Sequence, residues 1–488
     1  MRPAALLFLI PALAAPLAAQ ERATSLEAFL PAEHWSRHAL RRLAGIGAVA
    51  AGDAIGAWPL ARSRVRRLLE DADTSTVAAA ALTRHHVRHF ESEFDTFTTA
   101  PVALHGSLEA GMSAHGARLR AGRSFLEGDY SGPVDIPDDV HPAFDASASL
   151  RLMNRLVLAA ALRDTAGDVH IHEAYAALRA GPLLARAGRI SFGLGGASNG
   201  GDFVLDSPPP FDGAVLELPE GFGLPRPIGR VRASLLVSRM ARSGDIEHPW
   251  FLAARVTFAP ADNFVWGLQR AIIFGGAGNE EVTVRRLLEA LIGLTDTENK
   301  ATNFENQMVS GDLFWKLPDR PVSVHAIWAT DDAGQAFINV PAVVIGADWH
   351  VLPFAPSLGA GVDVSIITPQ KATYPPWYIH RGLGDGWTDR GTPLGHPLGG
   401  HGRELLLTVQ GSGTNIEASG RFFVRKRGRF NLFAPDLEGN SVGVGTDGTF
   451  YAAGPLRLGF RLDAERHARA GWTWSGGITA GVSALAWR

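Results

Sequence analysis

Cysteine is absent from this 488-residue chain, so disulfide bonds and thiolate metal sites are excluded. A dominant charge is lacking too, because the formal net charge is −3 at pH 7 and the basic residues are scattered. Such a distribution does not indicate a basic surface for binding nucleic acid. Beyond the N-terminal residues no run of about 18 apolar residues occurs, so the sequence predicts no transmembrane helix. A closed β-barrel is another way for a chain to cross a membrane.

Familiar catalytic and ligand-binding motifs are missing as well. The glycine-rich stretch 193–201 looks like a phosphate-binding loop, but no Lys-Ser/Thr pair follows it and an Asp-Phe-Val segment comes next in place of a helix. No Gly-x-Ser-x-Gly nucleophile elbow occurs. His85 and His89 have the spacing of two metal ligands on one helix face, yet no glutamate lies between them. We expect no enzyme activity, no cofactor and no metal.

The N-terminus has the pattern of a secretory signal peptide. Arg2 precedes the apolar stretch 4–10, and Pro11 and small residues follow as far as Gln20. A basic start, a short apolar core and a small-residue end are the three parts of such a signal. We assign residues 1–20 to a signal peptide and expect the mature chain to be exported.

From about residue 100 apolar and polar residues alternate with a period of two, which predicts β-strands with two different faces. In the stretch 250–258 every even-numbered residue is apolar, whereas Arg255 and Thr257 lie on the other face. A short break at 260–262 and a second alternating stretch at 264–269 predict a hairpin. The same alternation recurs in the segments 104–113, 144–152, 230–238, 404–410, 456–463 and 472–483.

The apolar faces of these strands could meet a protein core or lipid. The alternating segments run to about nine to eleven residues, the length that a tilted strand needs to cross a bilayer, whereas sandwich strands are typically shorter. Aromatic residues lie near strand ends, as interfacial girdles do: Trp250, Phe258, Phe264 and Trp474. Arginines recur on the polar faces and predict a charged lumen: Arg151, Arg232, Arg255, Arg421 and Arg457. We predict an outer-membrane β-barrel over residues 99–488, for which the available length gives roughly 16 to 18 strands.

Two segments depart from this pattern. Residues 280–294 have helical spacing and are expected in a long loop. Trp487, near the C-terminus, falls on the opposite parity to the apolar face of its strand, although barrels usually end with an aromatic residue in register with that face.

The segment before the barrel is predicted to be helical. Ser25-Leu26-Glu27 resembles a helix start, and apolar residues recur at helical spacing within 35–43, 63–69 and 76–94. We assign residues 21–98 to an N-terminal periplasmic helical bundle. Short helices bury little apolar surface alone, so we expect the bundle to dock on the periplasmic mouth of the barrel and close it.

Acids and histidines gather in the later connecting segments. Asp331-Asp332 ends a predicted strand, and histidines recur at 380, 396 and 401. Such groups can form a hydrolase site at a barrel rim, but a polar extracellular loop explains them more simply.

Several short motifs, in a common order, resemble the capsule assembly Wzi family. The segment 187–195, with Gly188-Arg189 and a glycine-rich turn, leads into the proline-rich segment 205–211. Further matching motifs lie at 58–60, 267–270, 274–276, 306–307, 314–318, 328–332 and 390–399. His401 departs from the pattern, because an acidic residue is expected there. The resemblance covers most of the mature chain.

The resemblance implies an all-β transmembrane β-barrel of about 18 antiparallel strands with a small N-terminal α-helical bundle. It further implies a lectin that binds capsular or extracellular polysaccharide at the cell surface, with outer-membrane lipid around the barrel, no nucleic acid, and a single copy of the chain. The residues that best suit sugar binding, by aromatic faces and charged groups, are Trp328, Asp331, Asp332, Trp377, Tyr378, His380, Trp387, Asp389 and Arg390.

Alternatives remain at this stage. Trp377 and Trp387 are equally suited to an interfacial girdle. A porin or transporter of small solutes would share the arginine-rich lumen, in which we also expect Arg189. A hydrolase is the third possibility.

Overall fold

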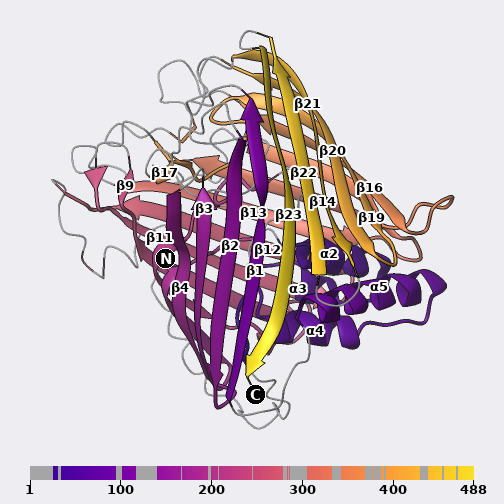
Figure 1. Ribbon diagram of the computed structural model, residues 1–488. Coiled ribbons are helices and arrows are strands. Elements are labelled where there is room, and N and C mark those ends of the chain that lie inside the picture. Colours follow the sequence, from indigo (N-terminus) through magenta and orange to yellow (C-terminus); the bar gives the residue numbers. More distant parts are fainter. Residues whose placement is uncertain are drawn as a thin grey trace.

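The computed structural model shows a β-barrel with helices inside one end (Figure 1). The structure describes residues 26–30, 34–94, 102–116, 140–165, 168–195, 199, 201–206, 208–243, 246–277, 283, 285, 305–331, 342–368, 377–378, 386–389, 392–428, 438–452, 456–468 and 471–487.

One antiparallel sheet closes on itself, because β1 pairs with β2 on one side and with β23 on the other. Of its 19 described strands, β7 (Phe222–Gly223) has only two residues, and the other 18 encircle the lumen. These are β1 (Val102–Gly116), β2 (Val140–Leu152), β3 (Leu156–Thr165), β4 (Asp168–Ala180), β5 (Leu183–Ile190), β6 (Phe211–Glu217), β8 (Arg230–Arg239), β11 (Trp250–Ala261), β12 (Phe264–Phe274), β13 (Glu305–Lys316), β14 (Val322–Asp331), β15 (Ala342–Trp349), β16 (Leu358–Ile367), β19 (Gly402–Ser412), β20 (Ile416–Arg427), β21 (Gly439–Tyr451), β22 (Leu456–His467) and β23 (Gly471–Trp487). The predicted fold class is confirmed.

Short paired segments lie outside the barrel wall. β9 (Arg242–Ser243) pairs with β10 (Ile246–Glu247), and β17 (Thr388–Asp389) pairs with β18 (Thr392–Pro393). Both pairs belong to the connections between barrel strands.

The two faces of the wall have opposite chemistry. On β22 the residues Leu456, Leu458, Phe460 and Leu462 point outward and are exposed, whereas Asp463 and the next inward residues are buried. On β11, Trp250 is exposed on the outside and Arg255 is buried inside. This is the inverse of a water-soluble sandwich, so the apolar face is suited to lipid, and the predicted lumen arginines are confirmed.

The two ends of the barrel differ in their connections. Short turns join β4 to β5, β11 to β12 and β19 to β20, at the end where β1 begins and β23 ends. Long segments, 117–139, 191–210, 275–304 and 368–401, join strands at the other end. In transmembrane barrels short turns are typical of the periplasmic side and long loops of the extracellular side.

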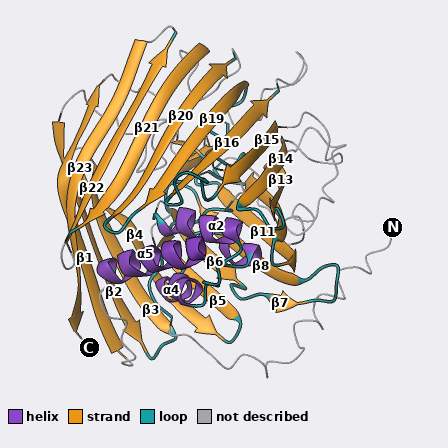
Figure 2. Cartoon of the chain, turned by 90° about the vertical axis from the view of Figure 1, so that its right-hand side faces the viewer, coloured by secondary structure: helices purple, strands orange, loops and turns teal. Residues whose placement is uncertain are grey.

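The N-terminal helices lie at the short-turn end, within the curve of the strands (Figure 2). They are α2 (Ser36–Ile46), α3 (Ala51–Ala54), α4 (Arg62–Glu70) and α5 (Val77–Glu93). The Thr76 hydroxyl caps α5 by accepting from Ala79 N at 3.1 Å, and α2 ends at Gly47, whose φ of 82° is left-handed. No helix in the described part of the chain is long and apolar enough to span a membrane.

The helical bundle and the barrel share one apolar cluster. Leu40, Leu43 and Phe90 of the helices belong to it, as do Val265 of β12 and Phe314 of β13. The helix start predicted at Ser25-Leu26-Glu27 is wrong: the described residues 26–30 are not helical, and Phe29 forms a β-bridge with Ala61. These helices therefore gain an apolar partner from the wall itself.

Two positions differ from the sequence-based expectations. Arg189 does not lie in the lumen: it pairs with the exposed Asp212 at 3.2 Å, on the side opposite to the buried Phe211. β5 alternates without interruption: Arg186 and Ile190 are buried toward the lumen, whereas Arg189 shares the outward side with the exposed Ala187.

Trp487 gains its register from a bulge. The pairing of β1 with β23 shifts by one residue between Leu104 and His105, so that Trp487 stands opposite Leu104, whose side chain is in the exposed outward series. The predicted helical insertion at 280–294 lies almost wholly outside the described residues.

A charge placed on the outer face of a strand tests this inside-out arrangement. Val444 of β21 is exposed outward, and Thr449 of the same strand lines the interior. We expect Val444→Arg to destabilise the barrel in lipid by about 2–4 kcal/mol, because arginine is costly near the bilayer midplane. Thr449→Arg should cost much less. Urea titration of the barrel folded in vesicles measures both, and equal losses would contradict the assignment of the two faces.

Candidate functional site

The sequence predicts a ligand-binding surface near residues 328–390, and the structure brings several of those residues together at the long-loop end. Tyr378 is the centre of the contacts. Its hydroxyl donates to the Phe203 carbonyl at 2.8 Å and accepts from His396 N at 2.9 Å. Its backbone N–H donates to Asp331 Oδ2 at 2.7 Å. Tyr378 thereby ties the β16–β19 connection to the β5–β6 connection and to the end of β14.

The two candidate tryptophans belong to the same packed cluster. Trp387 donates from Nε1 to the Val204 carbonyl at 2.7 Å, and its ring meets Phe251 edge-on at 5.8 Å. The ring of Trp377 lies 6.0 Å from that of Phe203. Both tryptophans are 0% exposed, so their alternative assignment to an interfacial girdle is wrong. They order the loops from within.

The other predicted residues have different positions. Asp389 is buried and accepts from Ala241 N at 3.3 Å. Trp328 is half-buried on the outward side of β14, opposite to the buried His325 and Ile327. Asp332, His380 and Arg390 lie outside the described residues. Sugar binding by the nine candidates stays a prediction.

The β5–β6 segment around Asp202, to which Tyr378 and Trp387 are hydrogen-bonded, was not predicted from the sequence. Asp202 Oδ1 accepts from Val204 N at 2.7 Å, and Gln269 donates to its Oδ2 at 2.6 Å. Burial raises the pKa of Asp202 to about 6, although these hydrogen bonds oppose the rise. The apolar run Phe203-Val204-Leu205 between glycines and prolines is the signal that marks the segment as buried.

This β5–β6 segment reaches the helical bundle through one carboxylate. Asp348 on β15 accepts from Arg41 Nη2 of α2 at 2.8 Å and from Asn199 Nδ2 at 2.7 Å. Asn199 also donates its backbone N–H to Asp363 of β16 at 3.2 Å. The helices from one end and a loop from the other end therefore meet inside the barrel.

A second set of contacts holds α5 to the opposite wall. His86 Nδ1 and His89 Nδ1 both lie 2.9 Å from Glu417 Oε1, and His89 Nε2 lies 3.1 Å from the Thr414 carbonyl. Both ring nitrogens of His89 therefore face oxygen atoms of the barrel wall. The sequence pointed to His85 and His89 as a pair, but in the structure His86 and His89 contact the same carboxylate, that of Glu417.

Glu93, at the end of α5, collects donors from helix and barrel. His34 Nε2 lies 2.6 Å from it, Trp35 Nε1 donates at 2.8 Å and the Tyr451 hydroxyl donates at 2.9 Å. Burial alone would raise the pKa of Glu93, but the charge and hydrogen bond of His34 outweigh it and hold the pKa at about 2. Glu93 is thus a buried anion that anchors the bundle.

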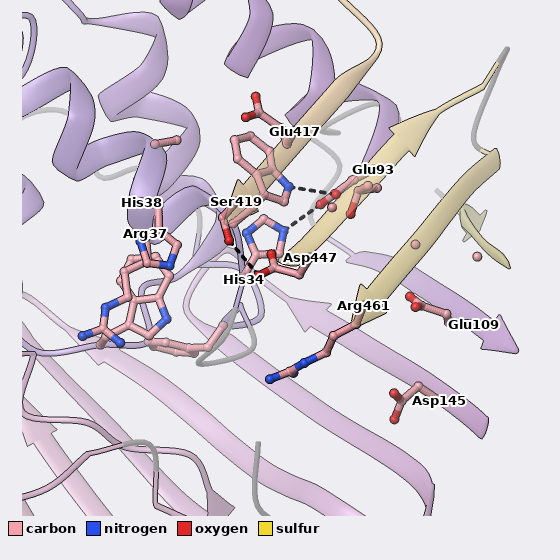
Figure 3. A pocket seen from close by; sticks show the side chains of 18 of the residues that line it. His34, Arg37, His38, Glu93, Glu109, Asp145, Glu417, Ser419, Asp447 and Arg461 are labelled. Carbon is pink, nitrogen blue, oxygen red and sulfur yellow. Dashed lines mark hydrogen bonds and ion pairs between the residues drawn. The ribbon is translucent and has the colours of Figure 1, made fainter. Parts of the chain in front are cut away.

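Between these contacts a polar cavity of about 650 Å³ remains in the lumen (Figure 3). Its walls include α2, α5, the strands β1–β4 and β19–β23, and the β5–β6 connection. Charged groups of both signs line it, among them Arg37, Glu109, Asp145, Asp447 and Arg461. Such a lining can bind a hydrated polar solute.

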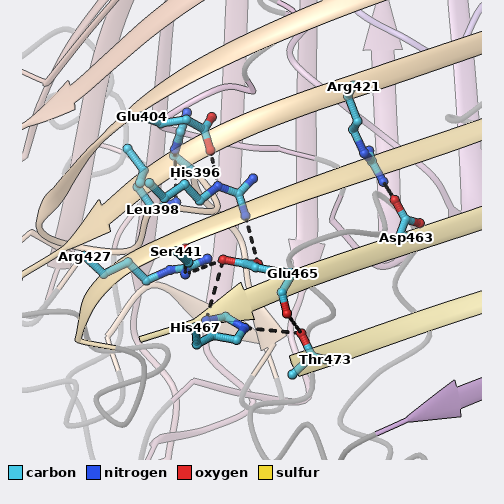
Figure 4. Close-up of polar contacts among 11 residues, drawn as sticks. His396, Leu398, Glu404, Arg421, Arg427, Ser441, Asp463, Glu465, His467 and Thr473 are labelled. Atoms are coloured by element: carbon cyan, nitrogen blue, oxygen red, sulfur yellow. Dashed lines mark hydrogen bonds and ion pairs between the residues drawn. The ribbon is translucent and has the colours of Figure 1, made fainter. Parts of the chain in front are cut away.

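The barrel wall in and beside the cavity carries a network of paired charges (Figure 4). Arg425 pairs with Glu404, and Arg427 Nη1 pairs with Glu465 at 2.8 Å. Arg421 pairs with Asp463. Within the described residues no group of three or more acids and histidines is placed to hold a metal ion. The chemistry that these residues offer is binding through charge and hydrogen bonds.

Comparison with known proteins gives one family. A family model described as capsule assembly protein Wzi matches residues 89–480, which is 392 of 488 residues. No curated protein matches the sequence significantly.

Solved structures resemble the fold. The Escherichia coli outer-membrane protein Wzi, involved in group 1 capsule assembly and described as a carbohydrate-binding β-barrel, has a TM-score of 0.72 at 16% identity, covering 93% of this chain and 99% of that one. Pseudomonas aeruginosa OccK5 (OpdH) has a TM-score of 0.47 at 9% identity, covering 79% and 98%. The channel DcaP of Acinetobacter baumannii has a TM-score of 0.36 at 10% identity, covering 78% and 97%.

Removing one hydroxyl tests whether Tyr378 orders the loops. Tyr378→Phe keeps the ring but leaves the buried His396 N–H without its acceptor, at a cost of about 1–3 kcal/mol. We expect faster proteolysis within the segments 191–210 and 377–401, while the barrel stays heat-modifiable on gels.

Tyr175→Phe is the matched control, because the Tyr175 hydroxyl accepts from Phe29 N beside the helical bundle. It should loosen the N-terminal segment and leave the loops intact. If Tyr378→Phe and wild type were cleaved in the loops at the same rate, Tyr378 would not hold them.

Proposed function

The chain belongs to the capsule assembly protein Wzi family, and on that basis we propose that it is a lectin of the bacterial outer membrane. It binds capsular polysaccharide and helps to attach or organise the capsule at the cell surface. The observation that carries the proposal is the family match over residues 89–480. The structural likeness to the Escherichia coli protein supports the same barrel fold.

The proposed orientation follows from the connections. The short turns and the helices α2–α5 face the periplasm, after a signal peptide of residues 1–20 has directed export. The long connections around Tyr378 face the outside. Lipid surrounds the apolar outer face, and the protein acts as a single copy.

The polysaccharide contacts the outer surface of these loops in this proposal. Asp332, His380 and Arg390 are the candidates for direct contact, since they lie in the connections that the described cluster anchors. Trp377, Tyr378 and Trp387 contribute by ordering the loops, because their rings are covered by protein. Asp331, Asp389 and Trp328 border the same region.

The alternatives fit the contacts less well. A porin needs a continuous aqueous path, yet helices and a loop meet inside this barrel at Asp348. A hydrolase needs an acid free to act on a substrate, yet Asp331 holds the backbone of Tyr378. We propose no catalytic role.

Binding of capsular polysaccharide to the purified barrel in detergent tests the proposal. We expect immobilised protein to retain polysaccharide from the producing strain, and Arg390→Gln to weaken retention roughly tenfold or more, as the loss of a charged hydrogen bond does.

Arg66→Gln is the matched control, because Arg66 is partly exposed on α4 and pairs with Glu70, four residues on. It should bind like wild type. A wild-type protein that retained no polysaccharide would refute the proposed function.

A further inference from the structure

The internal cavity is lined by arginines from both the helical bundle and the barrel wall. Arg37 projects from α2 into the cavity, and its guanidinium makes no hydrogen bond or ion pair with the described part of the chain. Burial lowers the pKa of Arg37, and the charge of Asp206 only partly offsets this effect. Arg37 is partly exposed to the cavity, and a cation without a close partner gains from an anion that enters beside it.

Two more guanidinium groups face the same space from the barrel wall. Arg421 and Arg461 both contact Asp463, and each keeps about a third of its side chain exposed, 32% and 33%. Asp463 itself is 1% exposed. Figure 3 shows Arg461 entering the pocket from its strand. Both side chains line the cavity, and planar guanidinium groups bind carboxylates well.

Hydroxyl-binding groups surround these arginines. Asp447 is the register partner of Arg461 and accepts from the Ser419 hydroxyl at 2.7 Å. His38, next to Arg37, also lines the cavity. The imidazole of His38 is exposed and can exchange hydrogen bonds with a sugar hydroxyl.

We propose that this cavity is an internal binding site for a small acidic sugar, whose carboxylate binds Arg461 and Arg421 and whose hydroxyls meet Asp447, Ser419 and His38. A volume of about 650 Å³ lies within the range of small-ligand pockets. Arg37 supplies a further positive charge from the bundle side. The site differs from the loop surface proposed to bind polysaccharide, and it does not depend on that function.

Calorimetry on the full-length barrel in detergent tests the site, with sodium glucuronate and glucose as the two probes. We expect glucuronate to bind roughly tenfold or more tightly than glucose, since a charged hydrogen bond distinguishes them. Added salt should weaken only the glucuronate interaction.

Two variants locate the binding. Arg461→Gln should lower the affinity for glucuronate roughly tenfold or more, and it leaves Asp463 paired with Arg421. Arg37→Gln breaks no hydrogen bond or ion pair within the described residues, so a weaker affinity of this variant for glucuronate reports a change in the cavity and not in folding. Arg66→Gln, on the outside of α4, should bind glucuronate like wild type.

Equal affinity for the two sugars, no binding of either, or unchanged glucuronate binding in both Arg461→Gln and Arg37→Gln would overturn the internal site. Capsular polysaccharide is measured separately on wild type. Glucuronate binding without polysaccharide binding would reject the proposed lectin function alone, and the reverse result would reject the internal site alone.

Discussion

The carboxylate of Asp348 is the interaction on which the rest of the interior depends. It stands on the barrel wall, receives Arg41 from the helical bundle and receives Asn199 from a connection at the opposite end. A charge inside a barrel is expensive unless it is paired, and removing one partner of a buried pair costs more than the pair gains. The strands therefore present inward charges that only the bundle and the loops can satisfy. Glu93 has the complementary role, as an anion of the bundle whose partners include Tyr451 on the wall.

The lipid around the barrel explains why the charged side chains lie inside it. A barrel in lipid needs an apolar outer surface and a closed ring of backbone hydrogen bonds. Every second residue of each strand therefore points outward, and these positions are mainly apolar. The remaining positions hold the polar side chains, and the lumen is too wide for side chains of the wall alone to fill. Helices fill one end and loops the other, and the cavity lined by Arg37, Arg421 and Arg461 is the space that neither fills.

Period-two alternation was sufficient to predict the barrel and its arginine-rich lumen, because parity is a local property of the chain. It failed at the bulge between β1 and β23, which restores the register of Trp487. The lumen position expected for Arg189 was also wrong, because the regular alternation of β5 places Arg186 there and Arg189 outside. Burial of Trp377 and Trp387 could not be predicted, since it arises from packing against Phe203 and Phe251, far away in the sequence. The pairing of Arg41 with Asp348 spans 307 positions and has no local signal.

The central claim is that charge pairing inside the barrel holds the helices and a loop together, so that no continuous channel passes through it. Planar-bilayer recording of the full-length protein tests the claim most directly. We predict no steady channel from the full chain, and new conductance once residues 25–95 are deleted, because the cavity then opens at the short-turn end. Large, steady channels from the full-length protein would contradict the account.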